Sequence, residues 1–238
     1  MDHLNADWPK FQTLLVFGIM LLAISAPKVT VSCDKLSPNC KLPSQVILPV
    51  ACILPSTLTS EKLIKNGSPI MGNIDAPITI LEWGDYQCTY CYKFHQNTLD
   101  IINEEFIKTG KVKIIFKDFP LNGFESKLAA EASYCAQDQQ KYWEYHNELY
   151  KNWGGERTGW ITRESLTKFA EIIELNTDDF NQCLDENKYQ NKVNSMHEFG
   201  KEIGIDATPS FLVFNDQKII KIRGNQPLEV FLKTFDEF

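Results

Sequence analysis

The fold is decided by the stretch Glu82-Trp83-Gly84-Asp85-Tyr86-Gln87-Cys88-Thr89-Tyr90-Cys91-Tyr92. It continues the short β-branched run 78–83, which is suited to a buried strand. From Thr89 to about Lys108, apolar residues recur at helical spacing. A second strand pattern covers residues 112–116. The order strand, helix, strand predicts a βαβ unit with two cysteines at the start of its helix.

The C-terminal part of the chain returns to strand patterns. Residues 209–214 and 219–222 are apolar runs joined by a polar turn, and Pro227 opens a last helix. Residues 124–200 carry helical periodicity instead. These patterns predict the α/β class, as a thioredoxin-like fold (βαβ plus ββα) with an inserted helical domain.

This organisation divides the chain into segments. We expect residues 65–123 and 201–238 to form the thioredoxin-like domain, and residues 124–200 to form the helical insertion. Residues 27–64 contain five prolines and no sustained periodicity, which is typical of a linker.

The N-terminal segment contains an apolar run, residues 14–26. Its 13 residues match the core of a signal peptide better than a bilayer span, which needs ~20 residues. The flank before the run is slightly acidic, which is a poor start for a signal peptide. Residues 1–26 are therefore expected to be either a signal peptide or an N-terminal membrane anchor.

The amino-acid composition indicates which classes of partner and which cellular compartment to expect. The 238 residues have a formal net charge of −7 and no basic cluster, so no nucleic-acid partner is expected. Seven cysteines are many for a reduced cytosolic protein. The sequence favours an extracytoplasmic location, in the periplasm or at the cell surface, either free or anchored by residues 14–26.

The pair Cys88 and Cys91 fits three chemistries: dithiol exchange, half of a zinc site, or a structural disulfide. Unpaired N–H groups at a helix start favour a Cys88 thiolate, and Cys91 is placed to attack a mixed disulfide formed there. The sequence has no second Cys-x-x-Cys, and His95 is expected to be a solvated helix residue. Dithiol exchange without a metal or organic cofactor is therefore favoured.

Residues 66–238 resemble the DsbA-like thiol–disulfide oxidoreductases, which have a thioredoxin fold. The segments that carry the resemblance are Gly72 with Ala76-Pro77, Glu82 to Cys91, Phe116-Lys117-Asp118-Phe119-Pro120-Leu121, and Ala207-Thr208-Pro209-Ser210-Phe211.

The resemblance implies roles for several residues. It implies that Thr208–Pro209 is a cis peptide beside Cys88, where the backbone pairs with a substrate strand. It also implies that Glu82 is a buried acid that accepts the proton of Cys91, with Lys117 on the neighbouring strand as the candidate partner of Glu82.

The chain departs from the family between its cysteines. It carries Thr89 and Tyr90 where the best-known oxidants carry Pro-His. Thr89 offers a hydroxyl to the thiolate and Tyr90 presents a less polar face to the substrate than histidine does. We therefore expect a less acidic Cys88 and a less oxidising disulfide.

Cys135 and Cys183 are candidates for a structural disulfide, because relatives carry cysteines at comparable places and both residues lie on apolar stripes. Thr177 is the expected cap of the second helix. The two stripes are Phe124, Leu128, Ala132 and Cys135, and Phe180, Cys183 and Leu184.

These observations predict an exported oxidoreductase that donates the Cys88–Cys91 disulfide to cysteines of reduced exported proteins. The family implies reoxidation by a membrane quinone-linked partner, and we expect a monomer. The alternatives are a disulfide reductase or isomerase, and a redox-silent thioredoxin-fold chaperone that binds peptides beside Pro209.

Overall fold

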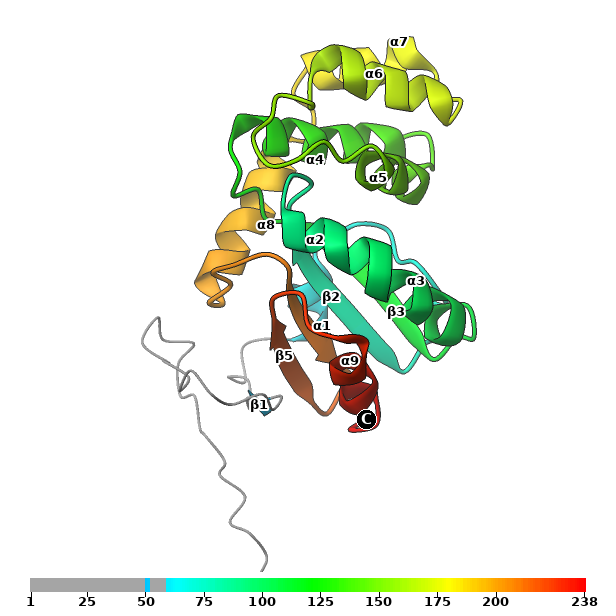
Figure 1. The fold of residues 1–238 in the computed structure, drawn as a ribbon, viewed down its shortest axis with the longest axis vertical. Helices are drawn as coiled ribbons and strands as arrows, with labels where there is room; N and C mark the ends of the chain where they lie inside the picture. Colours follow the sequence, from blue (N-terminus) through cyan, green and yellow to red (C-terminus); the bar gives the residue numbers. More distant parts are fainter. Residues whose placement is uncertain (1–49, 52–58) are drawn as a thin grey trace, which may run out of the picture. The chain divides into compact units, whose positions relative to one another are not determined.

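A mixed sheet organises the part of the chain that the computed structural model describes, residues 50–51 and 59–238 (Figure 1). Its five strands have the order β1-β5-β4-β2-β3. Their bounds are Val50–Ala51 (β1), Ile78–Gly84 (β2), Val112–Asp118 (β3), Ser210–Phe214 (β4) and Ile219–Arg223 (β5). β2 and β3 are parallel, whereas β4 runs antiparallel to both β2 and β5. The α/β thioredoxin-like prediction is confirmed.

Helices cover both faces of this sheet, because successive strand residues point to opposite sides. Ile80 and Ile114 pack with the helical run after the cysteines and with α9 (Leu228–Phe235). Leu81 and Ile115 face the other way, toward α1 (Ser60–Ile64) and the end of α8 (Gln190–Glu202). The helical run comprises α2 (Thr89–Phe94), η1 (His95–Leu99), α3 (Asp100–Ile102) and η2 (Asn103–Ile107).

Five helices follow β3 and form the inserted helical region. They are α4 (Phe124–Gln137), α5 (Tyr142–Lys151), α6 (Arg163–Ile172), α7 (Thr177–Asp185) and α8 (Gln190–Glu202). Helices α4 to α7 lie together at the end of the sheet where α2 begins (Figure 1). Cys88 and Cys91 pack into the same apolar cluster as the buried residues of these helices. The insertion therefore forms one wall around the cysteine pair.

Cys135 of α4 and Cys183 of α7 form a disulfide, with their Cα atoms 5.8 Å apart. Both residues are buried. Two details of the expected stripes are wrong. Phe124 is 74% exposed, because it is the first residue of α4 and precedes the part that packs inward. Asn176, not Thr177, caps α7, since its side chain accepts hydrogen bonds from two amides of the first turn.

The linker prediction for residues 27–64 is wrong at two places. Val50–Ala51 pairs with β5 at the edge of the sheet. Residues 60–64 form α1, where Thr59 accepts a hydrogen bond from the Lys62 amide and Leu63 is fully buried. Five residues are too short to show helical periodicity in a sequence. Residues 1–26, Cys33, Cys40 and Cys52 lie outside the described residues.

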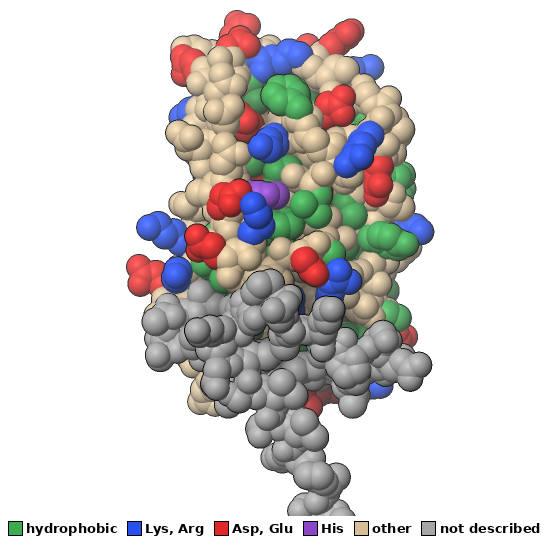
Figure 2. Space-filling view, turned by 90° about the vertical axis from the view of Figure 1, so that its left-hand side faces the viewer, with side chains coloured by type: hydrophobic (Ala, Val, Ile, Leu, Met, Phe, Trp, Pro, Cys, Tyr) green, Lys and Arg blue, Asp and Glu red, His purple; other side chains and the backbone are tan. Residues whose placement is uncertain are grey.

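Among residues 50–51 and 59–238, no helix has the length and apolar character needed to cross a membrane. On the face drawn in Figure 2, acidic and basic side chains are interspersed with apolar ones and no basic field gathers.

Candidate active site

The Asp85 carboxylate holds the loop between β2 and the first cysteine. It accepts hydrogen bonds from the amides of Gln87 (2.8 Å), Leu121 (2.7 Å) and Asn122 (2.8 Å) and from the Ser126 hydroxyl (2.7 Å). Asp85 is itself buried. The loop that presents Cys88 is thereby tied to the segment after β3 and to the first turn of α4.

The two thiols of the pair have different surroundings. Cys88 precedes the first residue of α2 and is 5% exposed, whereas Cys91 lies inside α2 and is fully buried. Both are free thiols in this structure. The Cys88 side chain lies 3.4 Å from the carbonyl oxygen of Thr208, to which its thiol donates a hydrogen bond.

This asymmetry separates the pKa values of the two sulfurs. A hydrogen bond from the Cys91 thiol, helped by Thr208 and by the amides of Cys91 and Tyr90, lowers the pKa of Cys88 from 9.0 to about 7 against the effect of burial. Burial, together with the neighbouring Cys88 and Glu82, raises the pKa of Cys91 well above 9.0. Because the thiolate is the species that attacks disulfides, the lowered pKa favours Cys88 as the candidate attacking sulfur of the pair.

Thr208 and Pro209 lie opposite the cysteine pair at the start of β4. The peptide bond between them is cis, as the resemblance implies. The Pro209 carbonyl accepts a hydrogen bond from the Gly224 amide at 2.8 Å, which fixes the turn to the end of β5. The contact between Cys88 and Thr208 places this turn directly beside the reactive sulfur.

Thr89 and Tyr90 occupy the exposed start of α2. Tyr90 is 58% exposed, with the Lys93 ammonium 5.4 Å from its ring centroid. The Thr89 amide donates a hydrogen bond to Glu156 Oε1 at 2.8 Å. Both residues therefore lie at the start of α2, next to Cys88 in the chain.

Glu82 lies in the middle of the sheet on the face that α2 covers, and it is fully buried. Neither carboxylate oxygen has a hydrogen-bond partner among the described residues. The His95 ring approaches it, with Nε2 at 3.4 Å from Glu82 Oε1. Glu82 also contributes to the raised pKa of Cys91.

His95 belongs to a buried aromatic cluster. The Tyr150 ring stacks on it with a centroid distance of 4.0 Å, and the His146 ring lies 4.8 Å away. His146 Nδ1 is 2.8 Å from the Tyr86 hydroxyl, which accepts a hydrogen bond from Ser133. Burial, with His95 nearby, lowers the pKa of His146 well below its ordinary value, so His146 is neutral.

Several known proteins are similar to this chain in sequence and in fold. A model of the thioredoxin family matches residues 65–236. Disulfide bond formation protein D of Bacillus subtilis (strain 168) is 31% identical over 158 residues, which are 65% of this chain and 70% of that protein. The chain belongs to the DsbA-like thiol–disulfide oxidoreductases.

Two solved structures agree with this membership. The crystal structure of oxidised BdbD from Bacillus subtilis matches with a TM-score of 0.66 and 28% identity, over 73% of this chain and 93% of that one. Wolbachia pipientis α-DsbA1 matches with a TM-score of 0.64 and 28% identity, over 73% and 90% of the two chains. The chain is thus a protein-disulfide oxidoreductase with the fold of DsbA.

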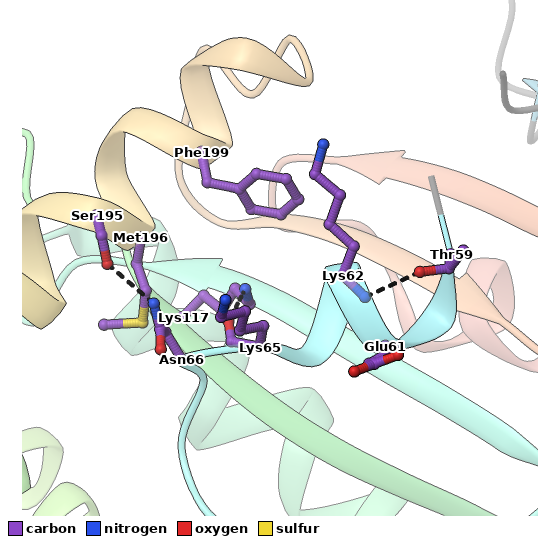
Figure 3. A pocket seen from close by; sticks show the side chains of 9 residues that line it. All are labelled: Thr59, Glu61, Lys62, Lys65, Asn66, Lys117, Ser195, Met196 and Phe199. Carbon is purple, nitrogen blue, oxygen red and sulfur yellow. Dashed lines mark hydrogen bonds between the residues drawn. The ribbon is translucent and has the colours of Figure 1, made fainter. Parts of the chain in front are cut away.

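One expectation for this DsbA-like enzyme is wrong: Lys117 does not pair with Glu82. Lys117 is in register with Trp83, so its side chain leaves the opposite face of the sheet. There its ammonium donates a hydrogen bond to the Lys65 carbonyl at 2.6 Å and lies 4.8 Å from the Phe199 ring centroid (Figure 3). Burial lowers the pKa of Lys117 to about 7. The group that approaches Glu82 is His95.

Sequence reasoning missed the partner of Glu82 and the role of the loop between α5 and α6. His95 follows Cys91 by four residues, which places both on one face of a helix, so the spacing was the available signal. It is 6% exposed and not solvated as expected. Glu156 had no comparable signal, because only the fold brings it to Thr89. In the part of the chain that the structure describes, no three His, Cys, Asp or Glu side chains cluster as metal ligands.

Proposed function

We propose that this oxidoreductase works as an oxidant that donates the Cys88–Cys91 disulfide to cysteines of reduced exported proteins. A substrate thiolate attacks Cys88, the Cys88–Cys91 bond breaks, and Cys91 leaves as a thiolate that takes up a proton. The second substrate thiolate then attacks the substrate sulfur of the mixed disulfide and releases the Cys88 thiolate. Two electrons pass from the substrate dithiol to the cysteine pair.

The observation that carries this proposal is the lowered pKa of Cys88, about 7. A thiolate stabilised in the reduced enzyme favours reduction of the disulfide, so the lowered pKa makes this pair a stronger oxidant than it would be with an unshifted Cys88. The sulfur that is stabilised is also the one nearer the surface, since Cys91 has no exposed area. Attack by a substrate is therefore directed to Cys88.

Glu82 is proposed as the group that exchanges a proton with Cys91. It lies on the face of β2 that α2 covers, and its carboxylate influences the pKa of Cys91. His95 Nε2 lies 3.4 Å from Glu82 Oε1. A buried acid whose oxygens have no hydrogen-bond partner among the described residues is suited to exchange a proton during catalysis.

The substrate site is proposed to run along Thr208 and Pro209, with Thr89 and Tyr90 on its other border. The turn next to Cys88 offers backbone groups to an extended chain, which a peptide uses when it adds to a sheet edge. The exposed ring of Tyr90 offers an apolar surface that substrates of many different sequences can contact. Such a site fits an enzyme that serves many unfolded proteins.

The compartment and the reoxidising partner are part of the proposal. The Cys135–Cys183 disulfide supports an extracytoplasmic location, since disulfides persist in oxidising compartments. Residues 1–26 would direct or anchor the protein there. A membrane quinone-linked partner would remove the electrons from Cys88 and Cys91, and a monomer suffices for this cycle.

We further propose residues 65–123 and 201–238 as the catalytic domain and residues 124–200 as its insertion.

The test uses Cys88→Ala in oxidative refolding of a reduced substrate protein. We expect the variant to lose the activity, because no sulfur remains for the substrate to attack. Cys91→Ala is the matched variant: it also loses turnover, but it still forms mixed disulfides through Cys88. Full activity of Cys88→Ala would overturn the proposal. Equal suppression of substrate aggregation by all three proteins, with no oxidation by wild type, would point to the peptide-binding chaperone instead.

A further inference from the structure

The loop of residues 153–160, between α5 and α6, rests on the start of α2. The indole of Trp153 donates a hydrogen bond to the Gln87 carbonyl at 3.1 Å, and its ring stacks on Tyr92 with a centroid distance of 4.5 Å and an interplanar angle of 11°. The Arg157 amide donates to Gln87 Oε1 at 2.8 Å. These contacts fix the loop to the residues on both sides of Cys88.

The loop is also braced internally. The Thr158 hydroxyl donates to the Gly154 carbonyl at 2.9 Å, and the Trp160 indole donates to the Gly155 carbonyl at 2.9 Å. Arg157 has a φ of 54°, a left-handed conformation that is uncommon outside glycine. The residue between Gly155 and Arg157, Glu156, is therefore held in a defined position.

Glu156 uses this position to bind the first amide of α2. Its Oε1 accepts the hydrogen bond of the Thr89 amide at 2.8 Å, and Thr89 directly follows Cys88. The next two amides, of Tyr90 and Cys91, are directed to the Cys88 sulfur instead. A carboxylate and a thiolate thus share three successive N–H groups at one helix start.

Two anions in this arrangement oppose each other. The Glu156 carboxylate and the Cys88 thiolate are each stabilised by the N–H groups and by the positive end of the helix dipole. Because both are negatively charged, each destabilises the other by Coulomb repulsion. The cations on the neighbouring elements are Arg157, whose guanidinium lies 3.5 Å from the Leu121 carbonyl, and Lys93, near Tyr90. Neither forms an ion pair with Glu156 among the described residues.

We propose that Glu156 is a positioning residue that weakens the oxidant. By placing a negative charge on the amide after Cys88, it disfavours the Cys88 thiolate and so makes the Cys88–Cys91 disulfide less oxidising than the same site would be without it. The insertion thereby sets the strength of the oxidant as well as enclosing its site. The inference rests on the dithiol chemistry of the proposed function, but it holds in either direction of electron flow.

The test is Glu156→Gln in the full-length protein. Glutamine keeps the oxygen that accepts the Thr89 hydrogen bond and removes the charge. We expect the pKa of Cys88 to fall by about half a unit to one unit, as removal of a nearby charge in partly exposed surroundings does. The equilibrium constant with glutathione should shift about two- to fivefold toward reduced enzyme, a rise in reduction potential of about 9 to 21 mV at 29.6 mV per tenfold.

Glu171→Gln is the matched control, because it removes an equal charge from the exposed surface of α6. Glu171→Gln should leave the Cys88 pKa and the equilibrium constant with glutathione unchanged. Salt should reduce the difference between wild type and Glu156→Gln, since screening weakens the repulsion of exposed charges. A structural role alone would change the melting temperature and leave the Cys88 pKa in place.

An unchanged or raised Cys88 pKa in folded Glu156→Gln overturns the proposal and leaves the proposed function standing. A Cys88–Cys91 pair that cannot be titrated with glutathione in wild type overturns both.

Discussion

At the scale of single residues, the chemistry depends on the different burial and pKa of Cys88 and Cys91. Both belong to one helical start, yet only Cys91 is fully buried. Burial raises the pKa of Cys91, and its thiol serves as the hydrogen-bond donor that most lowers the pKa of Cys88. The acidity of the reactive sulfur is therefore a property of the pair.

Alkylation of the reduced protein measures this acidity. Because the thiolate reacts and the thiol does not, the rate at Cys88 should rise with pH and reach half of its plateau near pH 7. Cys91→Ala should move this midpoint upward, since it removes the largest cause of the lowered pKa. Mass spectrometry assigns the modified site. A midpoint near 9.0 in the wild type would contradict the assignment of Cys88 as the acidic thiol.

The second prediction at this scale concerns Glu82. Glu82→Gln should slow thiol exchange by about tenfold or more at neutral pH, because Cys91 loses the group that exchanges its proton. His95→Gln should slow it less, since the carboxylate stays. Stopped-flow oxidation of a dithiol peptide gives the rates.

Lys117→Met is the control for Glu82→Gln, because Lys117 is buried on the opposite face of the sheet. Its exchange rate should equal that of wild type. A slow Lys117→Met variant together with a fast Glu82→Gln variant would contradict the assignment of proton exchange to Glu82 and would point to Lys117 instead.

At the scale of elements, the junction between β2 and α2 is held from three directions. Asp85 ties it to the segment after β3 and to α4, the loop 153–160 binds it from the insertion, and Thr208 contacts it from the start of β4. The insertion is consequently part of the active-site structure. Within the insertion, a disulfide joins α4 to α7.

Removal of that disulfide should destabilise the protein. Cys135→Ala with Cys183→Ala should lower the free energy of unfolding by ~4 kcal/mol, because a crosslink that closes a loop of 48 residues restricts the unfolded chain. Urea unfolding, with Cys88 and Cys91 in the same redox state in both proteins, measures the difference. A loss below about 1 kcal/mol would show that strain offsets the crosslink.

The sequence was informative where the chemistry depends on local order. The strand–helix junction can be predicted without tertiary information from the run 78–83, the cysteine pair and the helical spacing that follows. The structure has β2 and α2 at these places. Contacts between distant segments were beyond its reach. Lys117 and Phe116 are adjacent in sequence, and only the register of β2 with β3 decides which of them faces the Glu82 side.

At the scale of the whole molecule, the chain combines a thioredoxin-like domain with an insertion that completes its active site. Cys88, Cys91 and the turn at Thr208 meet where these parts join. Stabilisation of the Cys88 thiolate drives the proposed oxidation, and Glu156 moderates it. Both effects concern the same quantity, the reduction potential of the Cys88–Cys91 pair.

The direction of electron flow is the central claim, and trapping the protein directly from cells tests it. Acid quenching followed by alkylation records the redox state of Cys88 and Cys91 at that moment, and mass spectrometry reads it site by site. An enzyme that donates disulfides is kept oxidised by its partner, so the account predicts that most molecules carry the Cys88–Cys91 disulfide. A pair found mostly as free thiols would contradict the account and indicate a reductase.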